Sequence, residues 1–275
     1  MIAGMKIALC NEVLGPMPFA EQCAFAAALG YDGLEVAPFT LGPEPHLLPA
    51  AERRELRVVA DAYGLAITGL HWLLVTPEGL SVTSPDDAVR AHTRDVIERL
   101  VGLCADLGGT VLVHGSPKQR ALVDGARDRA VEIFRAAGDA AGAAGVTYCL
   151  EPLARNETDF VNTVEEAVAL IDEAGSAGLA TMIDTSAAGQ TEAMPVPALL
   201  DRWLPTGRVA HIQLNDTNRR APGQGADDFA AILAALRRNR YDGIVAVEPF
   251  IYHPDGPSTA ARAIGYLQGL AESSQ

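Results

Sequence analysis

Short apolar runs alternate with longer amphipathic stretches along the whole chain of 275 residues. Stretches such as Ala88–Asp106 and Asp124–Ala144 have helical spacing. The apolar runs between such stretches predict eight buried strands: Ile7–Asn11, Gly33–Val36, Ala66–His71, Thr110–His114, Val146–Glu151, Ala180–Asp184, Val209–Leu214 and Ile244–Glu248. Eight strand–helix units without a change of composition predict the α/β class, with residues 1–275 forming a single (β/α)8 TIM barrel domain.

The last four predicted strands end on side chains that bind metals. Glu151, Asp184 and Glu248 are carboxylates, and His211 and Gln213 share one strand face because they are two residues apart. The carboxyl ends of parallel strands meet at one end of a barrel, so we expect these groups to converge. Buried carboxylates repel one another unless a divalent cation lies between them. Oxygen ligands favour a hard ion such as Mn²⁺ or Mg²⁺, and the choice between His211 and Gln213 stays open.

The net charge of −14 argues against nucleic acid or an anionic membrane surface as a partner. The cysteines are widely spaced, with no CxxC pair, which disfavours a disulfide framework or a zinc knuckle. The chain shows no secretory signal pattern, and no apolar run approaches the roughly 18–20 residues of a membrane span. We therefore expect a cytoplasmic protein without a membrane partner.

Four segments of the second half carry a family resemblance: Glu151–Thr163, His211–Arg219, Pro222–Gly225 and Gly243–Phe250. They resemble motifs of the xylose-isomerase-like sugar isomerase and epimerase superfamily, especially its ketose 3-epimerase and hydroxypyruvate isomerase branches. The resemblance implies a divalent metal, which we expect to be Mn²⁺, with Mg²⁺, Co²⁺ and Zn²⁺ as alternatives. It also implies the ligand set Glu151, Asp184, Gln213 and Glu248, and it places His211 at a neighbouring inward position.

The resemblance also implies a reaction, which is proton transfer at a carbon next to a carbonyl through a metal-stabilised enediolate. Glu151 and Glu248 would act as base and acid on the two faces of the sugar. Exchange on both faces gives epimerisation, whereas transfer along one face gives aldose–ketose isomerisation. We expect an enzyme of the ketose 3-epimerase type that acts on a small sugar or keto-sugar. Dimers and tetramers are common among such enzymes, so a homodimer or homotetramer is expected.

Several other residues are candidates for substrate binding. Glu157 and Arg219 match positions whose side chains bind sugar oxygens in the epimerases. Histidines at the ends of barrel strands are candidate site residues, although each could instead make a structural hydrogen bond. A tryptophan at the end of a strand could stack on a sugar ring or pack in the core. The six expected substrate-binding residues are Glu157, Arg219, His71, Trp72, His114 and His211.

The sequence departs from the epimerases directly after Asp184. They have Asp-Thr-Phe-His-Met there, whereas this chain has Ala187 at the histidine position. The smaller residue leaves room for a bulkier substrate, so a lyase or deglycosidase acting on an oxidised 3-keto-glycoside is an alternative, as is a hydroxypyruvate isomerase. A DNA-repair endonuclease would need more histidines and a basic groove. A binding module without catalysis conflicts with the intact carboxylates.

Overall fold

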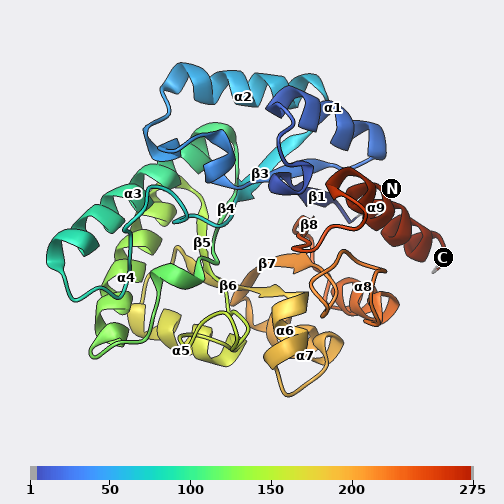
Figure 1. The fold of residues 1–275 in the computed structure, drawn as a ribbon. Helices are drawn as coiled ribbons and strands as arrows, with labels where there is room; N and C mark the ends of the chain where they lie inside the picture. Colours follow the sequence, from blue (N-terminus) through green and yellow to red (C-terminus); the bar gives the residue numbers. More distant parts are fainter. Residues whose placement is uncertain (1–4, 274–275) are drawn as a thin grey trace.

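Eight parallel strands pair in chain order in the computed structural model, which describes residues 5–273. The first strand also pairs with the last, so the sheet closes into a barrel (Figure 1). The strands are β1 (Ile7–Cys10), β2 (Gly33–Val36), β3 (Ala66–Leu70), β4 (Val111–His114), β5 (Thr147–Leu150), β6 (Leu179–Asp184), β7 (Val209–Leu214) and β8 (Val245–Val247). This architecture confirms the predicted barrel, and every predicted strand agrees with the observed one to within one residue at each end.

Helices surround the barrel on the outside (Figure 1). They are α1 (Phe19–Leu29), α2 (Ala50–Ala62), α3 (Asp87–Leu107), α4 (Ala126–Ala144), α5 (Val164–Ala174), α6 (Thr185–Thr191), α7 (Val196–Trp203), α8 (Phe229–Arg238) and α9 (Gly256–Ser273). Short 3-10 turns add η1 (Asn11–Leu14), η2 (Pro38–Leu41), η3 (Pro45–Leu47), η4 (Pro117–Gln119) and η5 (Leu204–Thr206). Among the described residues, no helix combines the length and the apolar character needed to cross a membrane.

The apolar residues form two clusters that reflect the two faces of the strands. The larger cluster lies between the barrel and the helices and includes Leu112, Phe134 and Leu150. The smaller one contains Val113, Cys149 and their neighbours on β4 to β6, and it occupies that side of the barrel interior. Because successive strand residues point to opposite faces, Glu151 and Asp184 continue the inward face beyond this small cluster. The interior is therefore apolar beside β4 to β6 and polar where the strands end, and it also holds the buried side chains of Glu35 and His211.

Candidate active site

Three carboxylates converge where strands β5, β6 and β8 end. The side chains of Glu151, Asp184 and Glu248 each place an oxygen within 4.8 Å of the others. None of the three residues is more than 2% exposed. The structure thus brings together three of the four expected metal ligands in a group that solvent barely reaches.

Burial and mutual repulsion disfavour charge on all three groups. Burial raises the pKa of Glu151 and of Glu248 well above the ordinary value, and the neighbouring carboxylates raise both further. Burial also raises the pKa of Asp184 to about 7, even though hydrogen bonds from Ala187 and Asn215 oppose the shift. Both carboxylate oxygens of Glu248 lack a hydrogen-bond partner among the described residues. Such a group of buried, underpartnered oxygens fits a hard divalent cation.

Gln213 is the fourth expected ligand, and it lies opposite Asp184 in the pairing of β6 with β7. Its side-chain nitrogen donates a hydrogen bond to Oε1 of Glu35 over 2.9 Å. Its side-chain oxygen is buried and has no partner among the described residues, so it is available to a cation. His211 is placed differently, because its Nε2 lies 2.8 Å from Oε2 of Glu35, and both side chains are buried.

Asn215 ties three neighbouring strands together at the level of the carboxylates. Its Nδ2 donates to Oδ2 of Asp184 over 2.6 Å and to the backbone oxygen of Glu248 over 2.8 Å. Its Oδ1 accepts from the backbone nitrogen of Ser186 over 2.7 Å. Asn215 therefore sets the spacing between two candidate ligands. The sequence analysis missed it because an asparagine directly after a strand also fits an ordinary turn.

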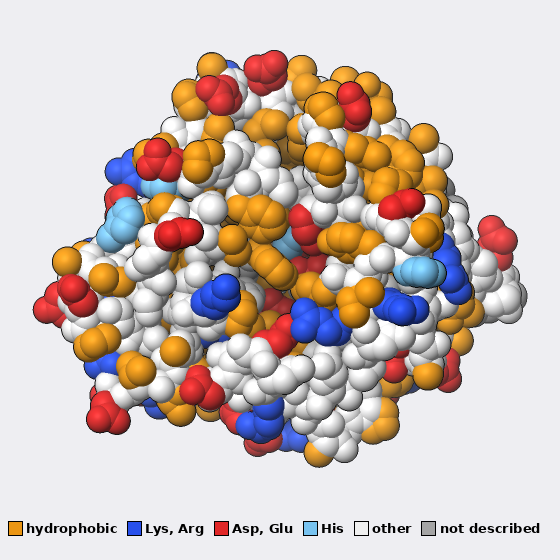
Figure 2. Space-filling model, viewed as in Figure 1, with side chains coloured by type: hydrophobic (Ala, Val, Ile, Leu, Met, Phe, Trp, Pro, Cys, Tyr) orange, Lys and Arg blue, Asp and Glu red, His pale blue; other side chains and the backbone are white. Residues whose placement is uncertain are grey.

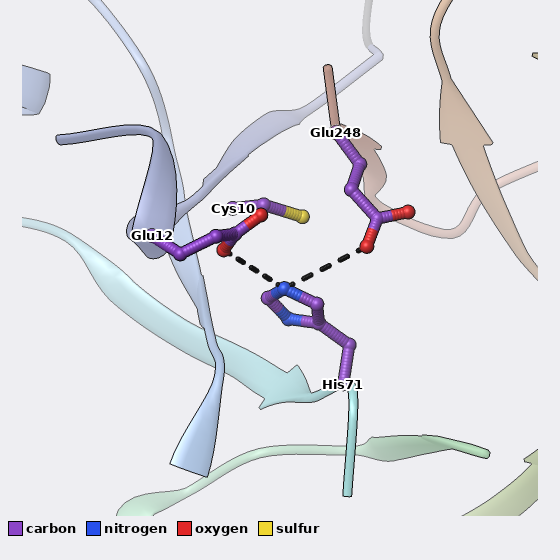
Figure 3. Close-up of side chains that lie close together, drawn as sticks. All are labelled: Cys10, Glu12, His71 and Glu248. Atoms are coloured by element: carbon purple, nitrogen blue, oxygen red, sulfur yellow. Dashed lines mark hydrogen bonds and ion pairs between the residues drawn. The ribbon is translucent and has the colours of Figure 1, made fainter. Parts of the chain in front are cut away.

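A second group of polar side chains lies beside the carboxylates, on the β1 and β3 side of the barrel (Figure 3). The Nε2 of His71 is 2.9 Å from Oε2 of Glu12 and 3.7 Å from Oε1 of Glu248. Burial alone would lower the pKa of His71, but the charge and hydrogen bond of Glu12 outweigh it and the pKa is raised overall. Cys10 completes this group, and neither it nor Glu12 was singled out from the sequence. His71 thus reaches the candidate metal group as a neighbour of Glu248.

A cavity of about 790 Å³ opens at this end of the barrel. Figure 2 shows the hollow, with acidic side chains deep inside it and hydrophobic side chains around it. Glu151 lines the cavity together with Glu157 and Arg219, which form an ion pair of 3.0 Å. Trp72 and Phe250 form an aromatic wall, with stacked rings whose centroids are 6.0 Å apart. Three expected substrate-binding residues, Trp72, Glu157 and Arg219, therefore share one cavity with a candidate ligand.

His114 lies away from this cavity. Its Nδ1 is 2.8 Å from the hydroxyl of Tyr148, and its ring packs edge-on against Phe134 of α4. Burial and the nearby Arg120 lower the pKa of His114 to about 3, so the ring is neutral at pH 7. In the strand register His114 pairs with Leu150, and both point outward toward the helices. The structure therefore places His114 outside the cavity, between the barrel and helix α4.

Arg120 contacts the backbone of a proposed site residue from outside the cavity. The sequence analysis did not list Arg120 among the expected site residues. Its side chain is fully buried, and Nη1 donates to the backbone oxygen of Glu151 over 2.6 Å. The contact holds the end of β5 at the point where Glu151 enters the site. A lone basic residue in a loop usually faces solvent, which is why no local pattern distinguishes this one.

Gly115 leaves room for the carboxylate of Glu151, and this predicts the effect of one substitution. A Cβ at this position would overlap Oε2 of Glu151, so Gly115→Ala displaces the carboxylate while the backbone stays in place. We expect stability to fall by about 1–3 kcal/mol because the site becomes overpacked. Turnover should fall about 100-fold, since small misplacements of reacting groups are costly. Gly265→Ala is the matched control, because a Cβ there meets open space. Unchanged turnover and Mn²⁺ affinity in Gly115→Ala would contradict this prediction.

Comparison with known proteins identifies the family. The model of the xylose isomerase-like TIM barrel family matches residues 23–270 of the chain. The chain belongs to this family. The match confirms the resemblance on which the sequence analysis relied, and it covers most of the barrel.

Curated relatives within this family are sugar epimerases. The D-psicose 3-epimerase of Enterocloster bolteae is 29% identical over 258 residues, which span 91% of this chain and 84% of that enzyme. The 3-dehydro-D-guloside 4-epimerase of Escherichia coli is 25% identical over 280 residues, covering 96% of this chain and 99% of that enzyme. Among solved structures, the 3-keto-D-glucoside 4-epimerase from E. coli superposes with a TM-score of 0.81 at 23% identity, covering 96% of this chain and 99% of that one. The predicted kinship with the ketose 3-epimerases is therefore confirmed.

Proposed function

We propose that this protein is a divalent-metal-dependent sugar epimerase that moves a proton at a carbon next to a carbonyl group. Its relatives place it among the enzymes that isomerise or epimerise carbohydrates. The observation that carries the rest of the proposal is the group of three buried carboxylates beside the cavity. Their position at the carboxyl ends of barrel strands is where TIM-barrel enzymes carry out their chemistry.

Four residues would hold the cation: Glu151, Asp184, Gln213 and Glu248. Their oxygen donors favour Mn²⁺ or Mg²⁺, and we propose Mn²⁺ as the resident ion. When bound, such an ion polarises a substrate carbonyl and stabilises the negative charge that develops on its oxygen. The unpartnered oxygens of Glu248 and Gln213 support this assignment, because a buried oxygen without a donor is costly unless a cation satisfies it.

Glu151 and Glu248 are the proposed acid and base. They come from β5 and β8, so they approach the centre of the barrel from different sides. Burial raises the pKa of each in the metal-free protein, which favours side chains that can take up and hold a proton. Glu157 and Arg219 would bind substrate oxygens from the cavity side, and the low exposure of the two acids excludes bulk water from the reacting carbon.

Two features favour a keto-glycoside as a second candidate substrate. The first is Ala187, which takes the place of a histidine in the resembling epimerases. The second is the cavity, whose volume lies within the roughly 300–1,000 Å³ that takes drug-sized ligands and whose Trp72 and Phe250 wall could stack on an additional ring. The E. coli relative that acts on a 3-dehydro-guloside is consistent with such a substrate. Epimerisation and loss of the aglycone would both begin with removal of a proton from a carbon next to the carbonyl, and loss of the aglycone requires that this carbon also adjoins the anomeric carbon.

One screen in D₂O tests the proposal. The Mn²⁺-reconstituted protein is incubated with ketoses, hydroxypyruvate and 3-keto-glycosides, and the products are followed by NMR. We expect deuterium at the carbon next to the carbonyl in at least one substrate, and no incorporation after treatment with EDTA. Aglycone release would instead identify the lyase. Absence of exchange in every substrate would refute the proposed proton transfer.

A further inference from the structure

We propose that Glu35 is a positioning residue, which orients the side-chain amide of Gln213 so that the amide oxygen serves as the metal ligand. The inference rests on the proposed metal site and adds to it a residue outside the expected ligand set. Glu35 lies on β2, across the barrel from Gln213 on β7. Neither residue is measurably exposed, so water does not compete for their contact.

The contact between Glu35 and Gln213 can form in only one direction. An ionised carboxylate only accepts hydrogen bonds, whereas an amide presents a donor on one side and an acceptor on the other. The nitrogen of Gln213 therefore faces Glu35, at 2.9 Å. The oxygen of the same amide is left without a partner among the described residues, although it is buried. This carbonyl oxygen lies on the strand next to Asp184. A hard cation prefers such oxygen ligands.

Two histidines lie beside the carboxyl group of Glu35, and their nearby positive charge would favour its ionised form. The Nε2 of His211 lies 2.8 Å from one oxygen of Glu35, and the Nδ1 of His71 lies 3.8 Å from the other. The Nε2 of His211 faces Glu35, whereas the amide oxygen of Gln213 is turned away from Glu35 because the amide nitrogen makes that contact. We therefore assign the fourth ligand position to Gln213, a choice that the strand spacing left open between Gln213 and His211.

A double-mutant cycle measured as Mn²⁺ affinity tests the inference. Glu35→Gln replaces a hydrogen-bond acceptor by an amide that can either donate or accept. The side-chain amide of Gln213 can then rotate by 180°, so we expect the Mn²⁺ affinity to fall by roughly 10- to 100-fold. Gln213→Glu in the parent places two carboxylates against each other and also weakens binding. The double variant E35Q/Q213E should recover most of the affinity, because a carboxylate at 213 accepts from the new amide and needs no orienting. Glu55→Gln on the exposed face of α2 is the matched control.

The outcomes separate this inference from the proposed function. Stoichiometric Mn²⁺ binding by the parent with equal affinity in Glu35→Gln overturns the positioning role and leaves the metal site intact. A double variant that binds no better than Glu35→Gln also overturns it, because a merely structural role for Glu35 predicts no recovery. Absence of divalent-ion binding by the parent overturns both proposals together.

A second measurement uses the parent protein, in case Glu35→Gln does not fold. Binding of diamagnetic Mg²⁺ should shift the side-chain carbonyl ¹³C signal of Gln213, which is assigned by its loss in Gln213→Glu. The ring nitrogen signals of His211 should stay unchanged when Mg²⁺ binds. A shift of the His211 ring nitrogens typical of metal coordination, with an unchanged Gln213 carbonyl, would reverse the assignment.

Discussion

Replacing Glu151 or Glu248 by glutamine is expected to abolish exchange of the substrate proton with solvent deuterium. Glutamine matches the shape of glutamate but can neither accept nor return the proton, and a positioned acid or base contributes roughly 100- to 10,000-fold to rate. The exchange is measured by NMR in D₂O with excess Mn²⁺. Glu132→Gln, on the exposed side of α4, is expected to exchange at the parent rate.

Metal analysis of the same variants separates the two proposed roles of each glutamate, metal binding and proton transfer. A variant that binds Mn²⁺ but exchanges no proton has lost acid–base function alone, whereas a variant without metal has lost a ligand. Retention of the parent exchange rate by Glu151→Gln or Glu248→Gln would remove that residue from the mechanism. The two substitutions therefore test the two residues independently.

The metal-free protein is expected to lose stability as the pH rises from about 5.5 to 8. The pKa values of Glu151, Asp184 and Glu248 are raised by burial, so the folded state keeps protons that the unfolded chain has already released. A raised carboxyl pKa stabilises the folded state at low pH, and this contribution is lost as the pH rises through the raised value. Urea unfolding in EDTA at the two pH values measures the slope.

Glu248→Gln should flatten this dependence and stabilise the metal-free protein at pH 8 by about 1–3 kcal/mol. Both oxygens of Glu248 lack hydrogen-bond partners among the described residues, so the substitution removes a buried charge without breaking a hydrogen bond. Mn²⁺ at 1,000 times the Kd of the parent should reverse the order, because it then stabilises the parent by about 4.1 kcal/mol. A parallel pH dependence in the parent and in Glu248→Gln would contradict the prediction.

The fold and the carboxylate group could be predicted from the sequence because their signals are local. Each strand is a short apolar run, and Glu151, Asp184 and Glu248 stand directly at or after the end of one. Parallel strands in a barrel end on the same rim, so sequence position alone was enough to expect these three side chains to meet. No knowledge of side-chain packing was needed for this step.

The supporting residues could not be predicted because their contacts join distant parts of the chain. Glu12 meets His71, and Glu35 meets Gln213 across the barrel, without a spacing that marks either pair. His114 shows a different difficulty, since it ends a strand as Glu151 nearly does but occupies the opposite face. A shift of one residue in strand register turns an inward side chain outward, and only the pairing of His114 with Leu150 settles its direction.

The cavity and the carboxylates are built from different parts of the chain, and this has an evolutionary consequence. Of the proposed ligands only Glu151 lines the cavity, whereas much of its wall comes from the segments after β3 and β4, such as Trp72, Leu80 and Lys118. Mutations in those segments can change which molecule the cavity recognises, while the proposed proton-transfer residues Glu151 and Glu248 stay the same. Exchange of these two loops between relatives is therefore a route to new sugar specificity in which the reaction itself is inherited unchanged.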